Sequence, residues 1–271
     1  MLINKRIKTC FKLLQKKKRA ALVTFVTAGD INYEKSLELI NNLPKAGADI
    51  IELGMPFTDP IADGEIIQKS TQRSLKCGHN QKKTFDMVKR FRLIDNKTPI
   101  ILMGYYNPIY NYGIKKFIKD ANATQVDGLI IVDLPPEHAE EVCVPASKLG
   151  IDLIRIITPN TNAKRIPFIL NKSSGYIYYI SINGLTGGVT PKLSEVEKSI
   201  KLIRNFKFTS LPIAVGFGVR NIQIVKKLSK ISDAVVVGSA LLEQIEFFFY
   251  NPQKAISNVL KLTSSLAQAL I

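Results

Sequence analysis

Short, almost uninterrupted apolar runs recur along the chain, and longer amphipathic stretches separate them. Such runs are typical of strands that are buried on both faces, as in a parallel sheet covered by helices. We expect eight strands, near residues 20–26, 48–53, 99–104, 128–133, 151–157, 175–181, 212–216 and 233–237. Helical patterns lie between them, for example at 33–45, 81–93 and 221–230. This alternation of strand and helix indicates βαβ units.

Eight such units in 271 residues predict one α/β domain, a closed (β/α)8 TIM barrel over residues 1–271. An open, doubly wound sheet is the alternative, but no GxGxxG motif follows the first expected strand. The N-terminal segment carries Ile7, Phe11, Leu13 and Leu14 at helical spacing. We therefore expect an extra amphipathic helix before the barrel, in preference to a targeting segment.

Composition narrows the function classes. Hydrophobic residues make up 46% of the chain, which is enough for a large core. No apolar run reaches the roughly 18 residues that a membrane span needs, so we expect no membrane association. Cys10, Cys77 and Cys143 form no CxxC pair, which fits a reducing compartment. Because the chain has only two histidines, His79 and His138, we expect no metal site.

The net charge of +16 permits two interpretations. A basic protein can bind nucleic acid, and binding that falls steeply with salt would support that alternative. The basic residues are spread along the chain, however, and the densest run, KKKR at 16–19, has no interleaved aromatic residues. We favour a solvated lysine surface and expect no nucleic-acid partner.

In a TIM barrel, binding and chemistry lie at the C-terminal ends of the strands. Three glycine-rich segments follow late strands: NGLTGG at 183–188, GFG at 216–218 and GSA at 238–240. Glycine lets the backbone approach an anion, and N–H groups at a helix start can bind it. We expect a phosphate cradle made by Gly184, Gly218, Gly238 and Ser239. Ordinary tight turns are the alternative for each segment.

The segment ELGMPFTDPIADG, residues 52–64, brings carboxylates from a core strand into a loop. We place Glu52 at the end of the second strand, where loss of hydration raises a carboxyl pKa toward neutrality and suits a general acid/base. Asp63 is expected to stay ionised and to accept a hydrogen bond from a substrate N–H. The structural alternatives are a buried glutamate with backbone donors and an Asx turn. Asp59 and Asp133 fit turn or backbone-fixing roles.

Other mechanisms find no support in the residues. None of the strand-end segments contains a lysine, which argues against a Schiff-base aldolase. No Ser-His-Asp or Cys-His set is visible. The residues alone therefore predict acid/base chemistry on a phosphorylated substrate, without a metal or a covalent cofactor.

The segment ELGMPFTDPIADGEIIQKS closely resembles the signature of the tryptophan synthase α subunit family. FVTAGD, GYYNPI, DLPPEHAEE, NGLTGG, VGFGV and VGSALLE are similar to that family in the same order, from Ala21 to about residue 245. The resemblance implies retro-aldol cleavage of indole-3-glycerol phosphate to indole and glyceraldehyde 3-phosphate. It implies that Glu52 is the general acid/base and that Asp63 holds the indole N–H.

The resemblance also implies substrate contacts. Phe25 and Tyr105 match residues that line the indole pocket, and Tyr178 matches a tyrosine near the reacting side chain. Thr186 matches a threonine that meets the acid-bearing loop on closure. The positions that match backbone phosphate donors are Gly187, Gly218, Gly238 and Ser239.

The family partner is a β subunit that carries pyridoxal phosphate and consumes the indole, within an α2β2 heterotetramer. The resemblance implies no cofactor in this chain, and a location in a bacterial cytoplasm or, for an organelle-encoded chain, the plastid stroma. The residues that match the docking surface for the β subunit are Asp59, Pro60, Asn107, Pro108 and Pro135.

Two positions depart from the family pattern, Glu65 after Gly64 and Ile182 before the NGLTGG segment. Two alternatives also stay open. Another phosphate-binding barrel would need a lysine or a different acid pair at its strand ends. A catalytically silent subunit would only activate its β partner, and the presence of both Glu52 and Asp63 argues against it.

Overall fold

The computed structural model describes residues 5–181, 192–206, 210–216, 218 and 222–271. Within these residues the strands form one parallel sheet, in the order β5-β4-β3-β2-β1-β9-β8-β7-β6. Their bounds are β1 Ala21–Thr27, β2 Ile50–Gly54, β3 Ile100–Gly104, β4 Gly128–Ile131, β5 Asp152–Leu153, β6 Arg155–Ile157, β7 Ile177–Ile180, β8 Ile213–Gly216 and β9 Ala234–Val237.

The two ends of that order, β5 and β6, belong to one apolar run and are separated only by Ile154. The N–H of Ile154 donates to the carbonyl of Leu129 in β4 at 3.0 Å, so the run follows its neighbour across the break. Because β9 pairs with β1, the sheet curls into a nearly closed barrel. The expected TIM barrel and its eight strand runs are confirmed, with the fifth run divided in two.

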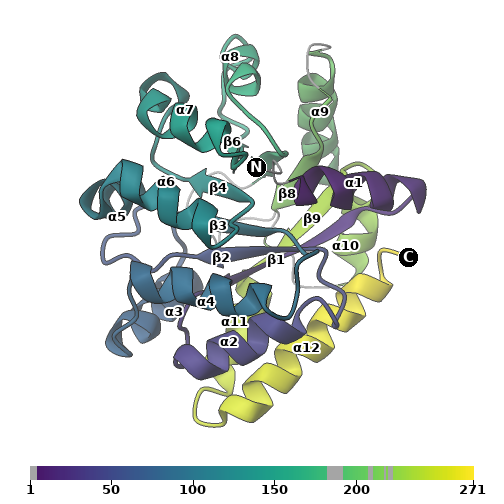
Figure 1. Ribbon diagram of the computed structural model, residues 1–271. Coiled ribbons are helices and arrows are strands. Elements are labelled where there is room, and N and C mark those ends of the chain that lie inside the picture. Colours follow the sequence, from purple (N-terminus) through teal and green to yellow (C-terminus); the bar gives the residue numbers. More distant parts are fainter. Residues whose placement is uncertain (1–4, 182–191, 207–209, 217, 219–221) are drawn as a thin grey trace.

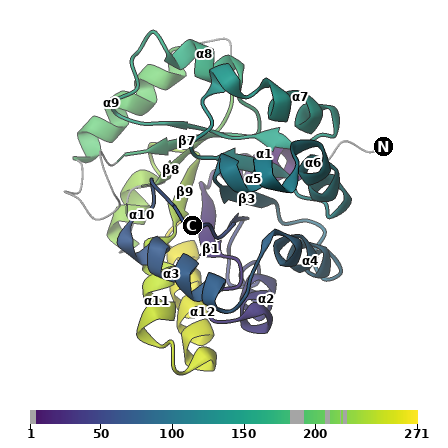
Figure 2. The same ribbon diagram turned by 90° about the vertical axis from the view of Figure 1, so that its left-hand side faces the viewer.

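Helices surround the strands, as Figures 1 and 2 show from two directions. The helices are α1 Arg6–Lys16, α2 Tyr33–Asn42, α3 Glu65–Lys76, α4 Gln81–Arg92, α5 Tyr106–Tyr112, α6 Ile114–Ala123, α7 Glu140–Lys148, α8 Ile166–Asn171, α9 Leu193–Arg204, α10 Ile222–Leu228, α11 Ser239–Phe247 and α12 Pro252–Gln268, with a 3₁₀ turn at Pro136–His138. Local sequence sets several starts: the side chains of Asn32, Asn80 and Asn251 each accept a hydrogen bond from a backbone N–H in the first turn.

The expected N-terminal helix is α1, Arg6–Lys16. Ile7 and Leu14 are buried and pack on the apolar side chains inside the barrel, at the N-terminal end of the strands. Leu13 was expected on the same face, but it is 54% exposed. Positions 7 and 14 fall on one stripe of the helix, and position 13 lies about 100° away from it, on the solvent side.

Aspartates hold the strands together at this N-terminal end. Asp49, Asp127 and Asp233 each precede a strand and accept a hydrogen bond from the first backbone N–H groups of a neighbouring strand, at 2.7–2.8 Å. Each also forms an ion pair with an arginine, and the pairs are Arg19–Asp49, Arg92–Asp127 and Arg204–Asp233. Stabilising ionic contacts therefore gather at the end of the barrel opposite to the expected site.

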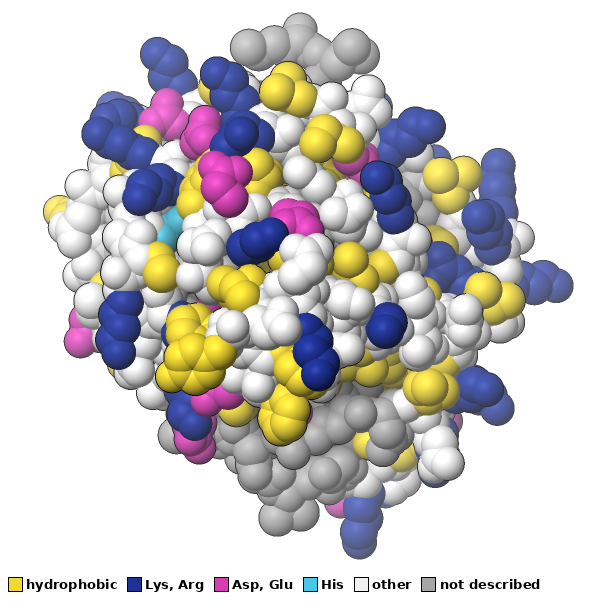
Figure 3. All heavy atoms as spheres, turned by 90° about the horizontal axis from the view of Figure 1, so that it is seen from below, with side chains coloured by type: hydrophobic (Ala, Val, Ile, Leu, Met, Phe, Trp, Pro, Cys, Tyr) yellow, Lys and Arg dark blue, Asp and Glu magenta, His cyan; other side chains and the backbone are white. Residues whose placement is uncertain are grey.

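Lysine and arginine side chains are scattered over the face in Figure 3, with apolar and uncharged groups between them. This distribution is that of a solvated basic surface on the face in view. In the part of the chain that the structure describes, no helix has both the length and the apolar character needed to cross a bilayer.

Candidate active site

A cavity of about 110 Å³ opens among the C-terminal ends of the strands. It brings together residues from distant parts of the sequence. The residues that line it are Phe25, Ala62, Asp63, Ile67, Met103, Val132, Tyr178, Ile180, Gly216, Gly218, Val236, Gly238 and Ser239. Six of these were expected as site residues from the sequence. The fold therefore brings together most of the expected site residues that lie in the described part of the chain.

Asp63 lies between β2 and α3, two residues before the helix begins. Its backbone carbonyl accepts a hydrogen bond from Gln68 Nε2 at 2.7 Å, and its N–H donates to Pro60. The hydroxyl of Tyr105 bonds its carboxylate and also accepts from the N–H of Ala62 at 3.1 Å. Burial raises the pKa of Asp63 to about 6, and the bond from Tyr105 opposes this rise. Asp63 is thus mostly ionised at neutral pH, and hydrogen bonds fix its backbone N–H and carbonyl.

Tyr105 lines a smaller hollow of about 20 Å³, which shares Phe25, Asp63 and Met103 with the main cavity. Burial raises the pKa of the Tyr105 hydroxyl above its ordinary value, as does the charge of Asp63. The hydroxyl therefore stays protonated and remains a donor to the carboxylate. Tyr105 supports Asp63 in addition to lining the apolar wall.

Glu52 does not lie at a strand end, as the sequence had led us to expect, but is the third residue of β2. It pairs in register with Phe25 of β1 and Ile101 of β3, and it is 0% exposed. The expected β2 ended one residue too early and began two too early, because Ala48 and Asp49 belong to the turn before the strand. Glu52 is consequently inside the barrel and is not among the residues that line the cavity.

Tyr176 is the hydrogen-bond partner of Glu52, and sequence reasoning missed it. Its hydroxyl donates to Glu52 Oε1 at 2.6 Å. Oε2 of Glu52 is buried and has no hydrogen-bond partner among the described residues. Burial raises the pKa of Glu52 to about 7, and the bond from Tyr176 works in the opposite direction. The alternation of tyrosines at 176 and 178, both on the inner face of one strand run, was the signal that could have identified Tyr176.

Tyr178 lines the cavity two residues further along the same run. Burial raises the pKa of its hydroxyl well above the ordinary value, and the charge of Glu52 adds to the effect, so the hydroxyl is neutral. A Cβ at Gly216 would lie 2.6 Å from that hydroxyl. Only glycine at 216 leaves Tyr178 the position that it occupies.

Backbone groups form the end of the cavity at which the sequence predicts phosphate binding. Gly238 precedes α11 and Ser239 is its first residue, and both line the cavity. The first N–H groups of the helix, which have no partner within the helix, therefore lie at the cavity wall. Gly218 has a φ of +57°, a conformation that glycine adopts without strain. A helix start with adjacent glycines is suited to binding a phosphate.

Three expected residues of this region, Thr186, Gly187 and Gly184, lie outside the described residues, as does the departure at Ile182. The other departure, Glu65, is the first residue of α3 and pairs with Lys69 at 2.9 Å. An acid in the first turn suits the partial positive charge of a helix start.

The residues expected to dock a partner lie on loops and short helices after β2, β3 and β4. Asp59, Asn107 and Pro135 are exposed, and Pro60 and Pro108 are half-buried. Asp133 accepts a hydrogen bond from the N–H of Tyr106 at 2.7 Å, so its expected role of fixing neighbouring backbone is confirmed.

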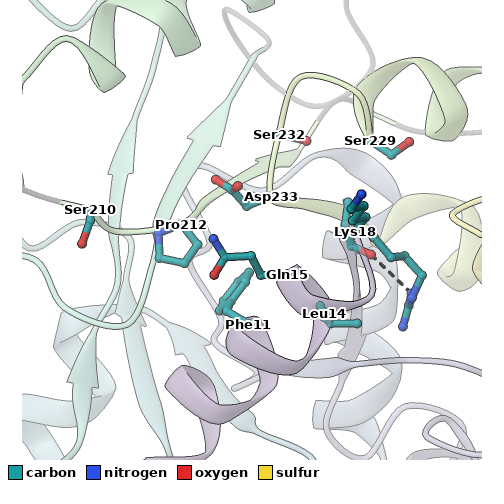
Figure 4. A pocket seen from close by; sticks show the side chains of 11 residues that line it. Phe11, Leu14, Gln15, Lys18, Ser210, Pro212, Ser229, Ser232 and Asp233 are labelled. Atoms are coloured by element: carbon teal, nitrogen blue, oxygen red, sulfur yellow. Dashed lines mark hydrogen bonds between the residues drawn. The ribbon is translucent and has the colours of Figure 1, made fainter.

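A second hollow, of about 320 Å³, lies at the opposite end of the barrel, beside the C-terminal part of α1 (Figure 4). Phe11, Gln15 and Lys18 face Pro212 and Asp233 across it. It contains none of the residues expected at the site. Among the described residues, no group of three or more histidine, cysteine, aspartate or glutamate side chains could hold a metal ion.

The model of the family "Tryptophan synthase alpha chain" matches residues 11–270. Tryptophan synthase subunit alpha from Legionella pneumophila is similar in structure, with a TM-score of 0.89 and 35% sequence identity over 98% of both chains. A chain of the Mycobacterium tuberculosis tryptophan synthase gives 0.87 and 26%, again over 98% of both chains. A chain of the Pyrococcus furiosus tryptophan synthase complex gives 0.82 and 36%, over 92% of this chain and 98% of that one.

The family match spans nearly the whole chain, and the structural similarity covers 98% of it. The chain therefore belongs to the tryptophan synthase α chain family and is a lyase of tryptophan biosynthesis, which cleaves indole-3-glycerol phosphate to indole and glyceraldehyde 3-phosphate.

Proposed function

We propose that Glu52 and Asp63 carry out this cleavage as an acid/base pair. The observation that supports the proposal most strongly is the environment of Glu52, a buried carboxyl with a pKa of about 7 and one oxygen without a partner. Such a group holds a proton at neutral pH and can also release it, as a general acid/base must. Asp63, with a pKa of about 6, is ionised under the same conditions.

In the first step, protonated Glu52 gives its proton to C3 of the indole ring while the indole N–H passes its proton to Asp63. The product is an indolenine, in which the ring nitrogen is now an imine. In the second step, the Glu52 carboxylate takes the proton of the hydroxyl next to the ring. The carbon–carbon bond breaks, its electrons return to the ring nitrogen, and that nitrogen recovers the proton from Asp63. Both carboxyl groups end in their starting states.

Glu52 needs a change of side-chain torsion to act in this way, because it is bonded to Tyr176 and does not line the cavity. Phe25, its neighbour in register, and Tyr178 do line the cavity, and we propose that a rotamer change brings the Glu52 carboxyl to it. Apolar Phe25, Met103 and Val132 suit the flat indole ring, and Tyr105 keeps Asp63 in place beside it.

We further propose that Gly218, Gly238 and Ser239 bind the phosphate through backbone N–H groups. Thr186 and Gly187 stay predictions from the sequence. The proposed steps need no metal and no organic cofactor in this chain. The continuous packing of α12 on α2, α11 and β1 supports the view that residues 1–271 act as one domain.

We also infer that a pyridoxal-phosphate-dependent β subunit is the partner and that the assembly is an α2β2 heterotetramer. The support is that similar chains come from a tryptophan synthase complex and that Asp59, Asn107 and Pro135 are exposed near the cavity. A cytoplasmic or plastid-stromal location follows from the same relationship. Mixing the chain with a matching β subunit and measuring the mass of the product in the analytical ultracentrifuge tests the stoichiometry. An Asp59→Ala, Pro135→Ala variant should associate more weakly.

The experiment that tests the catalytic proposal measures indole release from indole-3-glycerol phosphate, with the β subunit present. We expect the wild type to release indole and Glu52→Gln to be inactive while folded. Glu197→Gln, on the exposed side of α9, is the matched control and should behave like wild type. Normal turnover by folded Glu52→Gln would reject the role of Glu52.

A further inference from the structure

Two helices begin at the cavity, and each begins with a different part of the proposed site. Asp63 and Gly64 immediately precede α3, and Gly238 and Ser239 form the start of α11. Asp63, Gly238 and Ser239 all line the cavity. The two helices also pack against each other. Their relative position therefore sets the separation between the carboxylate and the backbone N–H groups of the helix start.

Arg73 ties these two helices together. It extends from α3, and its side chain is 13% exposed. Nε and Nη2 bind the carboxylate of Asp30 at 2.7 and 2.8 Å, and Nη1 binds Glu246 of α11. Asp30 is 2% exposed and also accepts from the hydroxyl of Ser70 at 2.7 Å. One guanidinium thus connects α3, the loop after β1 and α11.

Neighbouring contacts extend this connection to the site. Gln68, one turn into α3, donates to the carbonyl of Asp63. Ser74 Oγ donates to the carbonyl of Ala28, so a second residue of α3 holds the loop after β1. Lys69 joins Glu65 to Glu246, at 2.9 and 3.3 Å, but it is 44% exposed and contributes little by itself. Arg73 is less exposed than Lys69, and it reaches both Asp30 and Glu246.

We propose that Arg73 is a positioning residue that matches the separation of the indole and phosphate subsites to the length of the substrate. This inference rests on the proposed function of Asp63, Gly238 and Ser239. A substrate in which indole and phosphate are covalently linked binds more tightly than the two separate groups, and reacts faster, only if the two subsites lie at the right separation. The gain is lost when one helix shifts against the other, although each half-site stays intact.

The planar fork of arginine is needed for this role. Arg73 makes two parallel hydrogen bonds to Asp30 and has a further nitrogen for Glu246, whereas a lysine ammonium cannot reproduce that geometry. We therefore expect Arg73→Lys to keep the charge and lose much of the positioning.

The test compares joined and separate ligands. The joined ligand is a non-cleavable analogue in which a propyl chain links indole C3 to a phosphate. The separate ligands are indole and glycerol 3-phosphate. Dissociation constants for all three are measured by calorimetry for the wild type, Arg73→Lys, Arg73→Gln and Glu246→Gln, in the complex with the β subunit. The matched control is Arg92→Lys, which alters a buried ion pair with Asp127 at the other end of the barrel.

We expect Arg73→Gln to weaken the joined ligand by roughly 10- to 100-fold and the separate ligands by less than about 3-fold. Arg73→Lys and Glu246→Gln should give smaller losses of the same kind. Arg92→Lys should lower thermal stability and leave all three dissociation constants unchanged. A KM and kcat measurement on the cleavable substrate should show kcat/KM falling with the affinity of the joined ligand.

Equal weakening of joined and separate ligands would overturn the inference, because it would show that Arg73 only supports the fold. An unchanged affinity for the joined ligand in folded Arg73→Gln would overturn it as well. If Arg73→Gln does not fold, Glu246→Gln decides, since it leaves the contacts between Arg73 and Asp30 in place. Failure of the catalytic proposal would look different: normal turnover by Glu52→Gln, with ligand affinities that still follow Arg73.

Discussion

The hydroxyl of Tyr176 reaches Glu52 across the interior of the barrel, with 2.6 Å between the two oxygens. Three strands, β1, β9 and β8, separate β2 from β7, the strand that begins directly after Tyr176. The two residues therefore lie on opposite walls of the barrel, and the bond crosses its interior. It binds one oxygen of Glu52 and leaves the other unpartnered among the described residues. Burial raises the pKa of Glu52, and the hydrogen bond from the neutral Tyr176 hydroxyl offsets only part of that rise.

Replacing Tyr176 with Phe should change the pH dependence of the reaction. The hydrogen bond from Tyr176 lowers the pKa of Glu52, so its loss should raise that pKa further above about 7. The alkaline limb of the kcat/KM profile should move to higher pH. A packing defect alone would lower stability, by about 1 kcal/mol for the lost hydrogen bond, without moving the limb. An unmoved limb in the folded variant would separate Tyr176 from the titration of Glu52.

The wild-type profile of kcat/KM should be bell-shaped and narrow. Asp63 must be ionised, so activity should rise as pH increases through about 6. Glu52 must enter the reaction protonated, so activity should fall as pH increases above about 7. Rates measured between pH 5 and 9, with the β subunit present, check both limbs. In Asp63→Asn the acid limb should disappear, and its persistence would assign that limb to another group.

Asp63→Asn should affect kcat more than KM. The charge of Asp63 matters most when the indole nitrogen loses its proton, and an amide lacks that charge. We expect kcat to fall by roughly 100-fold, the usual effect of removing one electrostatic partner of a transition state. Steady-state kinetics provide the measurement. A rise in KM at constant kcat would mean that Asp63 serves binding alone.

Glu52→Gln should stabilise the protein at alkaline pH while abolishing activity. An ordinary glutamate pKa is 4.5, and in the folded protein Glu52 titrates at about 7. Between these values the unfolded chain has released a proton that the folded chain still holds, so wild-type stability falls as pH rises through this window. The loss is roughly 3 kcal/mol at most. Urea unfolding at pH 5 and pH 8 should show this difference in the wild type and not in the variant.

Asp127→Ala should have the opposite pattern, with a large loss of stability and no change in kcat. Asp127 accepts from the N–H of Ile100 and pairs with Arg92, whose side chain is 4% exposed. Removing it leaves a buried guanidinium without its main partner, which costs about 3–5 kcal/mol. Urea unfolding and steady-state kinetics on the same sample check both parts. Glu197→Ala, which removes only a solvent-exposed ion pair with Lys201, is the control for stability.

Most of the barrel could be predicted from the sequence, because strands buried on both faces require apolar residues at successive positions and leave an unmistakable pattern. Details that depend on neighbours could not. The break at Ile154, the exposure of Leu13 and the interior position of Glu52 follow from register and helix phase, each of which a shift of one or two residues changes.

The site divides in the same way. Asp63 and Phe25 lie in segments that carry the family resemblance, Tyr178 matches a family tyrosine, and the fold brings all three to one cavity. Tyr176 and Arg73 act through partners that are far away in the sequence, Glu52 and Glu246. Such pairs have no local pattern, so only the folded chain identifies them.

The first helix has a consequence for the chemistry at the other end of the barrel. Ile7 and Leu14 close the floor of the barrel, and the ring of Phe11 lies 5.9 Å from that of Tyr176. α1 therefore closes this end of the barrel and excludes water from the interior around Glu52. Loss of hydration is the main reason for the raised pKa of Glu52. A helix at the end of the barrel opposite to the cavity thereby affects the proton affinity of Glu52. Removing α1 should hydrate Glu52 and lower its pKa.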